Sequence, residues 1–245
     1  MERFSFVDCH SHVIPSGDDG AQSIEEGLSL CREAARCGTR ILFATPHVWP
    51  HVPLTDKRMR AIRAAYDEMR PQAGLELRLG FELTPMHALL QDDPARYELA
   101  GTGHVLMEVP FTGTAELVFA LGEHVVSAGL TPLIAHPERT EAVLDEPALA
   151  GAFAERGWPL QVNATSLLGR HGSAVESLAW SLIEDGTATI VASDGHRSTR
   201  PARLDTAYKA VARRVGEGAA ALFDGSVLGL ASPKRESFPA ESKAV

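Results

Sequence analysis

The chain has 245 residues, 44% of them hydrophobic, which suits one large α/β domain whose core needs no disulfides. Its formal net charge of -9 argues against a nucleic-acid partner, because such proteins usually present a basic face. Three cysteines without a Cys-x-x-Cys pair argue against a disulfide framework. No signal-peptide pattern and no apolar run of about 20 residues is visible, so we expect a cytoplasmic protein without a membrane span.

Segments with strand and helix patterns alternate along the chain. In chain order, we expect a strand at 4–9, a helix from Ser23 to Gly38, a strand at 39–45, a helix at 56–70, strands at 75–81 and 105–109, a helix at 115–128, a strand at 130–135, a helix at 148–156, a strand at 160–163, a helix at 173–185, a strand at 188–193 and a helix at 203–215. These seven strands predict a parallel sheet, either closed as a barrel or open and doubly wound. Residues 1–231 form the expected single domain, and the polar tail at 232–245 is predicted to be disordered.

Nearly every expected strand ends on a side chain that can bind a metal. In chain order these residues are His10 and His12, His47, Glu82, Glu108, His136, Asn163, and Asp194 with His196. In a parallel barrel all strand carboxyl ends open on one face, where active sites lie. Residues spread over the whole sequence would therefore converge in one bowl.

Each of these residues alone has an ordinary explanation. A single histidine is more often a buried residue with satisfied hydrogen bonds than a ligand, and a single glutamate is usually solvated. Glu108 is less ordinary, because it lies in the apolar run Val-Leu-Met-Glu-Val-Pro-Phe, where an unpaired carboxylate is costly. The joint placement at six strand ends is what favours a metal site.

The ligand types indicate the chemistry. Imidazole and carboxylate without thiolate suit Mn, Fe or Zn rather than a structural zinc site. Such ions lower the pKa of a bound water, and two of them about 3.5–4 Å apart hold both the attacking and the leaving oxygen of a displacement. Arg139, three residues after His136, and Arg200, four after His196, are the candidate phosphate-binding residues.

The motifs together resemble those of a known family. They are Asp8-x-His10-x-His12-x-x-Pro15-x-x-Asp18-Asp19-Gly20, Thr-Pro-His at 45–47, Gly-Phe-Glu at 80–82, Ala-His-Pro-Glu-Arg at 135–139, Gln-Val-Asn-Ala at 161–164 and Ser-Asp-Gly-His at 193–196. In this order they resemble the PHP (polymerase and histidinol phosphatase) superfamily. Within it the chain is most similar to the bacterial manganese-dependent tyrosine-protein phosphatases of capsule and exopolysaccharide synthesis, from Asp8 to about Arg203.

This resemblance implies a distorted seven-stranded (β/α) barrel of the PHP type with a trinuclear metal site. The implied ligands are His10, His12, Glu82 and Asp194 for the first ion, Glu82, Glu108 and His136 for the second, and Asp19, His47 and His196 for the third. Arg139 and Arg200 are implied to hold the phosphate. The choice of Asp19 over Asp18 rests on the resemblance, because the residues alone leave it open.

We therefore expect a metal-dependent phosphomonoester hydrolase, a protein-tyrosine phosphatase that uses a metal-activated hydroxide on two or three divalent ions, with manganese favoured. Its expected partner is a phosphotyrosine-containing protein, with a bacterial tyrosine kinase of polysaccharide synthesis as a candidate. An apolar rim of Val48, Trp49, Phe111, Leu167 and Leu168 would hold the ring, and Arg197 and Arg200 would meet acidic flanking residues.

Three alternatives stay open. The first is a small-molecule phosphatase of the same fold, acting on histidinol phosphate or a nucleotide. The second is an amidohydrolase-type metal hydrolase, which commonly needs a lysine at a strand end, whereas none of the four lysines stands there. The third is a metal-binding regulatory module without catalysis.

Overall fold

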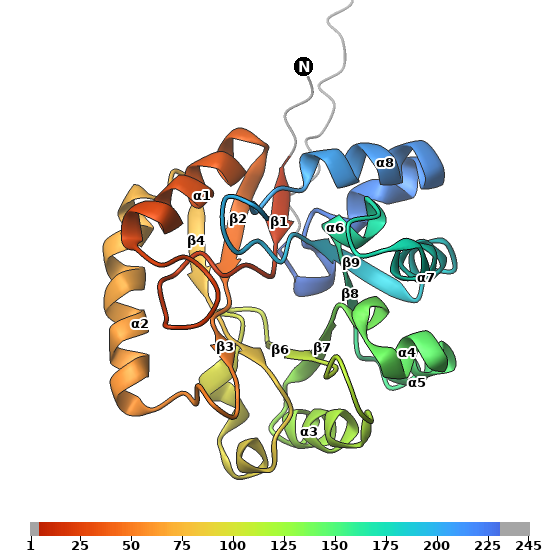
Figure 1. Cartoon of the computed structure of the whole chain (residues 1–245), viewed down its shortest axis with the longest axis horizontal. Coiled ribbons are helices and arrows are strands. Elements are labelled where there is room, and N and C mark those ends of the chain that lie inside the picture. The colour runs from red at the N-terminus through yellow and green to blue at the C-terminus, as the bar shows by residue number, and fades with distance from the viewer. Residues whose placement is uncertain (1–4, 231–245) are drawn as a thin grey trace, which may run out of the picture.

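The computed structural model describes residues 5–230 as parallel strands surrounded by helices (Figure 1). A three-stranded sheet has the order β1-β2-β4, and a six-stranded sheet has the order β3-β5-β6-β7-β8-β9. The strands are β1 (Phe6–Asp8), β2 (Thr39–Ala44), β3 (His47–Val48), β4 (Glu76–Leu79), β5 (Glu82–Leu83), β6 (His104–Glu108), β7 (Thr131–Ala135), β8 (Leu160–Asn163) and β9 (Ala188–Ala192). All pairs of neighbouring strands are parallel, as the alternating pattern predicts.

Helices connect most of the strands and cover the outside of the sheets (Figure 1). They are α1 (Ile24–Arg36), α2 (Asp56–Met69), α3 (Glu116–Ser127), α4 (Glu141–Asp145), α5 (Ala148–Ala154), α6 (Ala164–Leu167), α7 (Ser173–Glu184) and α8 (Asp205–Val215). Helix α1 begins as expected at Ser23, whose side chain accepts a hydrogen bond from the Glu26 amide. The short helices α4 and α6 are not predicted by the sequence pattern, because each is too short for a helical period to show.

The described residues form nine strands rather than the expected seven, because two of the expected strands are each divided into two pieces. The expected strand at 39–45 stops at Ala44 and resumes as β3, because Pro46 between them has no amide hydrogen for the ladder. The expected strand at 75–81 is interrupted likewise at Gly80 before β5. A Cβ on Gly80 would stand 2.4 Å from Leu99 Cδ2 and 3.1 Å from Leu99 Cα, so a larger residue here would have to displace Leu99. The predicted disordered tail at 232–245 lies outside the described residues.

The two ends of the strand series meet beyond β1 and β9. Ser11 and Gly195 form a parallel bridge, and the amide of His12 donates to the carbonyl of Gly195 at 2.7 Å. The amide of Asp194 donates to the carbonyl of His10 at 2.9 Å. These bonds join the first and last strands at their carboxyl ends, where the candidate ligands stand.

Two hydrophobic clusters follow the alternation of side chains along the strands. An inner cluster includes Cys9, Phe43, Leu106 and Ile190, which come from four strands or their ends. A larger outer cluster, running from Phe6 to Phe223, packs the opposite strand faces against the helices. Because Glu108 follows Leu106 by two residues, it points to the same side, above the inner cluster. Among the described residues, no helix is long and apolar enough to cross a membrane.

The packing of α3 yields a stability prediction. A Cβ on Gly122 would stand 2.2 Å from a ring carbon of the buried Trp158. We expect Gly122→Ala to lower the free energy of unfolding by about 1–3 kcal/mol, measured by urea denaturation, because the core is overpacked. Gly151→Ala in α5 is the control, since nothing lies within 4 Å of its Cβ position. There the better helix propensity should raise stability by about 0.5–1 kcal/mol, and equal effects of the two variants would contradict this packing.

Candidate metal centre and active site

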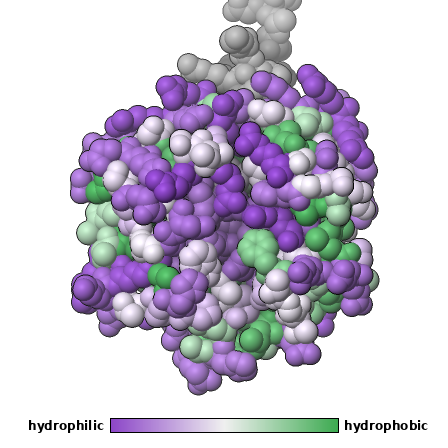
Figure 2. All heavy atoms as spheres, viewed as in Figure 1, coloured by the Kyte–Doolittle hydropathy of each residue, from purple (hydrophilic) through white to green (hydrophobic). Residues whose placement is uncertain are grey.

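The nine predicted ligands lie on one face of the molecule. Six of them stand at or just after the carboxyl end of a strand, whereas His47 and Glu82 begin the short strands β3 and β5. Figure 2 shows polar side chains gathered in a central hollow of this face. Eight of the nine are buried, and Asp19, on the loop before α1, is the exception with 57% of its side chain exposed. The structure thus brings the predicted residues together, whereas their role as metal ligands remains a prediction.

The donor atoms form three groups, each compact enough for one ion. The groups are His12, Asp19, His47 and His196; His10, Glu82 and His136; and His10, His12 and Asp194, and within each group the donor atoms lie within 4.8 Å of one another. The grouping agrees with the expected third ion, to which it adds His12. Glu108 belongs to none of these groups, and its carboxylate accepts a hydrogen bond from the Thr84 hydroxyl. Nothing in the sequence predicts this role of Thr84 except its position two residues after Glu82.

Glu82 stands at the centre of the cluster with a fully buried carboxylate. Its Oε2 atom lies 3.1 Å from His10 Nε2, 3.3 Å from His12 Nε2 and 2.8 Å from His47 Nδ1. Its Oε1 atom lies 2.9 Å from His136 Nε2. Although burial alone would raise the pKa of Glu82, the charges of His10 and His47 hold it well below the usual value. This carboxylate therefore stays charged, and four histidine rings contact its two oxygens.

The charges and the short distances within the cluster favour the binding of cations. His10 Nε2 and His12 Nε2 are only 3.1 Å apart, and both face the carboxylates of Glu82 and Asp194. Burial opposes a charge on His10, yet these two carboxylates raise its pKa to about 9. The pKa of Glu108 is raised to about 7, mainly by burial and further by the nearby negative charge of Glu82. An ion placed among these donors satisfies the lone pairs and neutralises the carboxylates, so the residues fit divalent metals.

Two of the predicted ligands have unusual backbone geometry. Within residues 5–230, His136 (φ 33°) and Asp194 (φ 50°) are the non-glycine residues with positive φ. Such conformations cost about 1–3 kcal/mol each and persist only where the surrounding structure imposes them. His136 directly follows β7, and Asp194 comes shortly after the end of β9. In both places the strained turn directs the side chain to the cluster.

The structure distinguishes the two neighbouring aspartates. The side chain of Asp18 is buried, and its carboxylate accepts hydrogen bonds from the amides of Gly20 (3.1 Å) and His47 (3.0 Å), so it holds the loop. Asp19 instead faces the site, 3.5 Å from His47 Nε2 and 3.2 Å from His196 Nε2. A Cβ on Gly20 would stand 2.4 Å from the His12 carbonyl oxygen, which explains glycine at this position.

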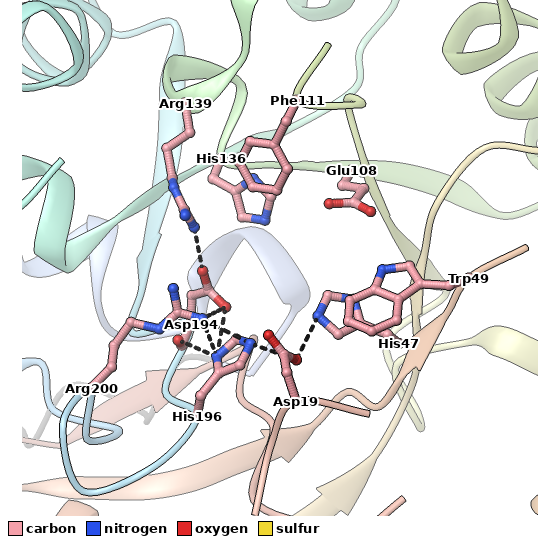
Figure 3. A pocket seen from close by; sticks show the side chains of 10 residues that line it. All are labelled: Asp19, His47, Trp49, Glu108, Phe111, His136, Arg139, Asp194, His196 and Arg200. Carbon is pink, nitrogen blue, oxygen red and sulfur yellow. Dashed lines mark hydrogen bonds and ion pairs between the residues drawn. The ribbon is translucent and has the colours of Figure 1, made fainter. Parts of the chain in front are cut away.

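A pocket of about 270 Å³ opens above the cluster (Figure 3). Its lining comprises Asp19, His47, Trp49, Glu108, Phe111, His136, Arg139, Asp194, His196 and Arg200. Arg139 Nη1 donates to Asp194 Oδ2 at 2.8 Å, and Arg200 Nη2 lies 2.8 Å from His196 Nε2. Both predicted arginines therefore line the same pocket as the predicted ligands.

The apolar rim is smaller than expected. Of the five residues expected there, Trp49 and Phe111 line the pocket, whereas Val48 and Leu167 are buried and Leu168 is exposed outside the lining. Trp49 stacks on His47 with ring centroids 4.0 Å apart, and Phe111 lies parallel to His136 at 5.8 Å. Arg197 forms an exposed ion pair with Glu26 (3.0 Å) and is absent from the lining, so its expected contact with acidic residues that flank the phosphotyrosine stays a prediction.

The fold and the site define an α/β protein with a cluster of histidines and carboxylates that could bind metal ions. The chain belongs to the CpsB/CapC family, because residues 6–223 match the family model described as capsular polysaccharide synthesis, CpsB/CapC. It is 30% identical over 207 residues to the tyrosine-protein phosphatase YwqE of Bacillus subtilis, which covers 78% of this chain and 77% of that protein. Over 225 residues it is 27% identical to the tyrosine-protein phosphatase CpsB of Streptococcus agalactiae, covering 86% and 91%.

A solved structure agrees with this assignment. It comes from a pair described as metal-dependent tyrosine phosphatases, YwqE from Bacillus subtilis and CpsB from Streptococcus pneumoniae. The match has a TM-score of 0.81 at 26% identity and covers 91% of this chain and 93% of that chain. The family resemblance expected from the motifs is therefore confirmed.

The position of Glu82 leads to a prediction about metal content. Glu82→Gln keeps the side-chain shape but removes the charge that contacts four histidines. We expect it to lower the bound metal per chain, measured by elemental analysis after exhaustive dialysis, together with the hydrolysis rate. Glu155→Gln, at an exposed position after α5, is the control and should keep the wild-type stoichiometry. Full metal content in Glu82→Gln would show that this carboxylate is not a ligand.

Proposed function

We propose that this protein is a metal-dependent phosphatase that removes phosphate from tyrosine side chains of proteins. The observation that carries the proposal is one pocket with a floor of buried histidines and carboxylates and two arginines in its wall. A phosphate monoester is an anion, so carboxylates alone would repel it. With cations held on the floor, the same pocket becomes attractive to phosphate. The relatives named tyrosine-protein phosphatases support the substrate class.

The metal assignment is part of this proposal. We assign His10, His12, Asp19, His47, Glu82, Glu108, His136, Asp194 and His196 as ligands of two or three divalent ions. Manganese is the proposed metal, because the donors are nitrogen and oxygen without thiolate and the sequence resembles manganese-dependent enzymes. When bound, such ions supply Lewis-acid charge neutralisation and acidify a water molecule.

The side chains of this protein would bind and orient the phosphoryl group. Arg139 and Arg200 both converge on Asp194, at 2.8 Å and 3.6 Å, so their guanidinium groups border the metal floor. The Arg139 guanidinium lies 4.9 Å from the centre of the Phe111 ring, which limits its motion. A guanidinium fork matches phosphate oxygens in two directions and opposes the charge that grows in the transition state.

The rim supports an aryl phosphate as substrate. Trp49 and Phe111 flank the pocket from two sides, and 46% of the Phe111 surface is exposed (Figure 3). Aromatic rings in such places stack on another flat ring in offset or edge-on arrangements. A phosphotyrosine side chain is long enough to reach the floor while its ring stays between them. Phosphoserine is shorter by several bonds and brings no ring.

Several further features belong to the same proposal. Gly80 donates to the Ala44 carbonyl and Glu82 to that of Pro46, which supports a single distorted seven-stranded barrel with two interrupted strands. The continuous outer cluster supports one domain over residues 1–231. All three cysteines are free, which suits a reducing, cytoplasmic compartment. A bacterial tyrosine kinase of polysaccharide synthesis is the proposed protein substrate.

The role of Arg139 can be tested separately from the metal centre. We expect Arg139→Ala to lower kcat on a phosphotyrosyl peptide by about 10²–10³, because one donor to the developing charge is lost. Metal content should stay at the wild-type level. Arg63→Ala, on the exposed side of α2, is the control and should leave kcat unchanged. An unchanged kcat in Arg139→Ala would mean that this side chain does not contact the substrate.

The substrate class is tested by comparing three compounds under one metal condition. We expect kcat/KM to be highest for a phosphotyrosyl peptide, then histidinol phosphate, with a phosphoseryl peptide well behind. Chelation of the metal should abolish all three activities. If histidinol phosphate were preferred by more than tenfold, about 1.4 kcal/mol in activation free energy, the protein-substrate proposal would be abandoned.

A further inference from the structure

Two buried amides connect two of the proposed metal ligands. Gln161 and Asn163, both on β8, are fully buried. The Gln161 Oε1 atom lies 2.9 Å from His10 Nδ1, and Gln161 Nε2 lies 2.7 Å from Asn163 Oδ1. Asn163 Nδ2 in turn lies 2.8 Å from Asp194 Oδ2. The amides thus form a continuous chain of hydrogen bonds from an imidazole on one side of the cluster to a carboxylate on the other.

The direction of every bond in this chain follows from its carboxylate end. Arg139 Nη1, which can only donate, also lies 2.8 Å from Asp194 Oδ2, so this carboxylate oxygen accepts from the side chains around it. Asn163 must then donate to it with Nδ2, which leaves Oδ1 to accept from Gln161. Gln161 in turn presents Oε1 to His10. The Nδ1 atom of His10 must therefore carry a hydrogen.

This direction fixes which nitrogen of His10 faces the cluster. When Nδ1–H donates to Gln161, the neutral ring has its lone pair on Nε2. That atom lies 3.1 Å from Glu82 Oε2 and 3.5 Å from Asp194 Oδ1, in the middle of the proposed ligands. A ring with the opposite tautomer would aim a hydrogen at the place of the ion.

The pattern of residues on β8 indicates that these two amides do more than fill space in the core. Val162, between them, packs in the outer hydrophobic cluster, so Gln161 and Asn163 share the opposite face. On the neighbouring strand β9 the inner positions hold Ile190 and Ala192. Placing two amides at such positions is costly unless every polar atom finds a partner. Here each of the four amide atoms has one.

The backbone around Asn163 is held firmly. Its amide donates to Glu138 Oε1 at 3.0 Å, and the Ser166 hydroxyl donates to the same oxygen at 2.7 Å. The carbonyl of Gln161 accepts from the amide of His136 at 2.7 Å. The two amides are therefore attached to a rigid part of the site rather than to a mobile loop.

We propose that Gln161 and Asn163 are positioning residues that set the metal-binding tautomer of His10 and orient Asp194 toward the same ion. The inference rests on the proposed metal centre but not on the proposed substrate. Residues that orient ligands in this way commonly contribute about 10–100-fold to metal affinity. The alternative is that the pair only fills the core, in which case the loss of either amide would lower stability alone.

The first experiment uses the wild-type protein. Loaded with Zn²⁺, which is diamagnetic, it would be studied by ¹⁵N NMR of its imidazole nitrogens, with His10 assigned by comparison with His10→Gln. We expect a protonated Nδ1 and a metal-bound Nε2 on His10. A metal-bound Nδ1 would overturn the proposal, and this test needs no variant of β8.

The second experiment measures metal affinity in variants by competition with a chromophoric chelator for Zn²⁺. Gln161→Met keeps the length but removes both hydrogen bonds, and we expect about 10–100-fold weaker binding with a mixture of His10 tautomers. Asn163→Asp places an acceptor opposite Asp194 and should weaken binding further. The matched control is Val162→Ala on the same strand, which should lower stability yet keep metal affinity and the His10 tautomer.

The outcomes separate this inference from the proposed function. Wild-type affinity in a folded Gln161→Met protein, or an equal loss in Val162→Ala, would refute the positioning role. If the wild-type protein failed to hydrolyse phosphotyrosine but bound Zn²⁺ and responded to these variants as expected, the positioning role would stand and the proposed function would fall.

Discussion

The site depends on one costly group, the fully buried carboxylate of Glu82. A charge in such a place is stable only if opposite charges and hydrogen bonds surround it on every side. Four histidine rings do so here, delivered by strands or strand ends that are far apart in the sequence. The hydrogen bonds that join the segment after β1 to the segment after β9 place His10 and His12 within reach, so the carboxylate is compensated only when the first and last strands have come together.

The same requirement explains where the backbone is unusual. His136 and Asp194 adopt left-handed conformations that most residues avoid, and Gly195 approaches Ala202 so closely that a Cβ would stand 2.5 Å from its Cα atom. Strain of this kind persists only when the surrounding structure determines it. Both strained residues supply donors to the cluster, so the strained non-glycine backbone within residues 5–230 lies at the site.

The sequence predicted the convergence of the site well but not its details. Ligands at the ends of strands could be recognised because parallel strands share one carboxyl edge. The break at Pro46 was foreseeable from its missing amide, whereas the packing of Gly80 against Leu99, which is distant in sequence, was not. The roles of Asp18 and Asp19 could not be separated by composition, since only the folded loop shows which carboxylate binds backbone amides. The ion pair of Arg197 could not be predicted for the same reason, because its partner Glu26 lies on α1.

The aromatic rim and the metal centre are physically coupled. The Trp49 ring stacks on the His47 ring, and the Phe111 ring lies parallel to the His136 ring. Each aromatic ring of the rim therefore packs against the imidazole of a proposed ligand. The Arg139 guanidinium lies over the Phe111 ring and donates a hydrogen bond to Asp194. An ion that ordered the two histidines would therefore also order the rim proposed to hold the substrate ring. In the opposite direction, a ring bound between Trp49 and Phe111 would restrain the ligands beneath it. By linkage, metal binding and aryl-phosphate binding should strengthen each other by the same factor.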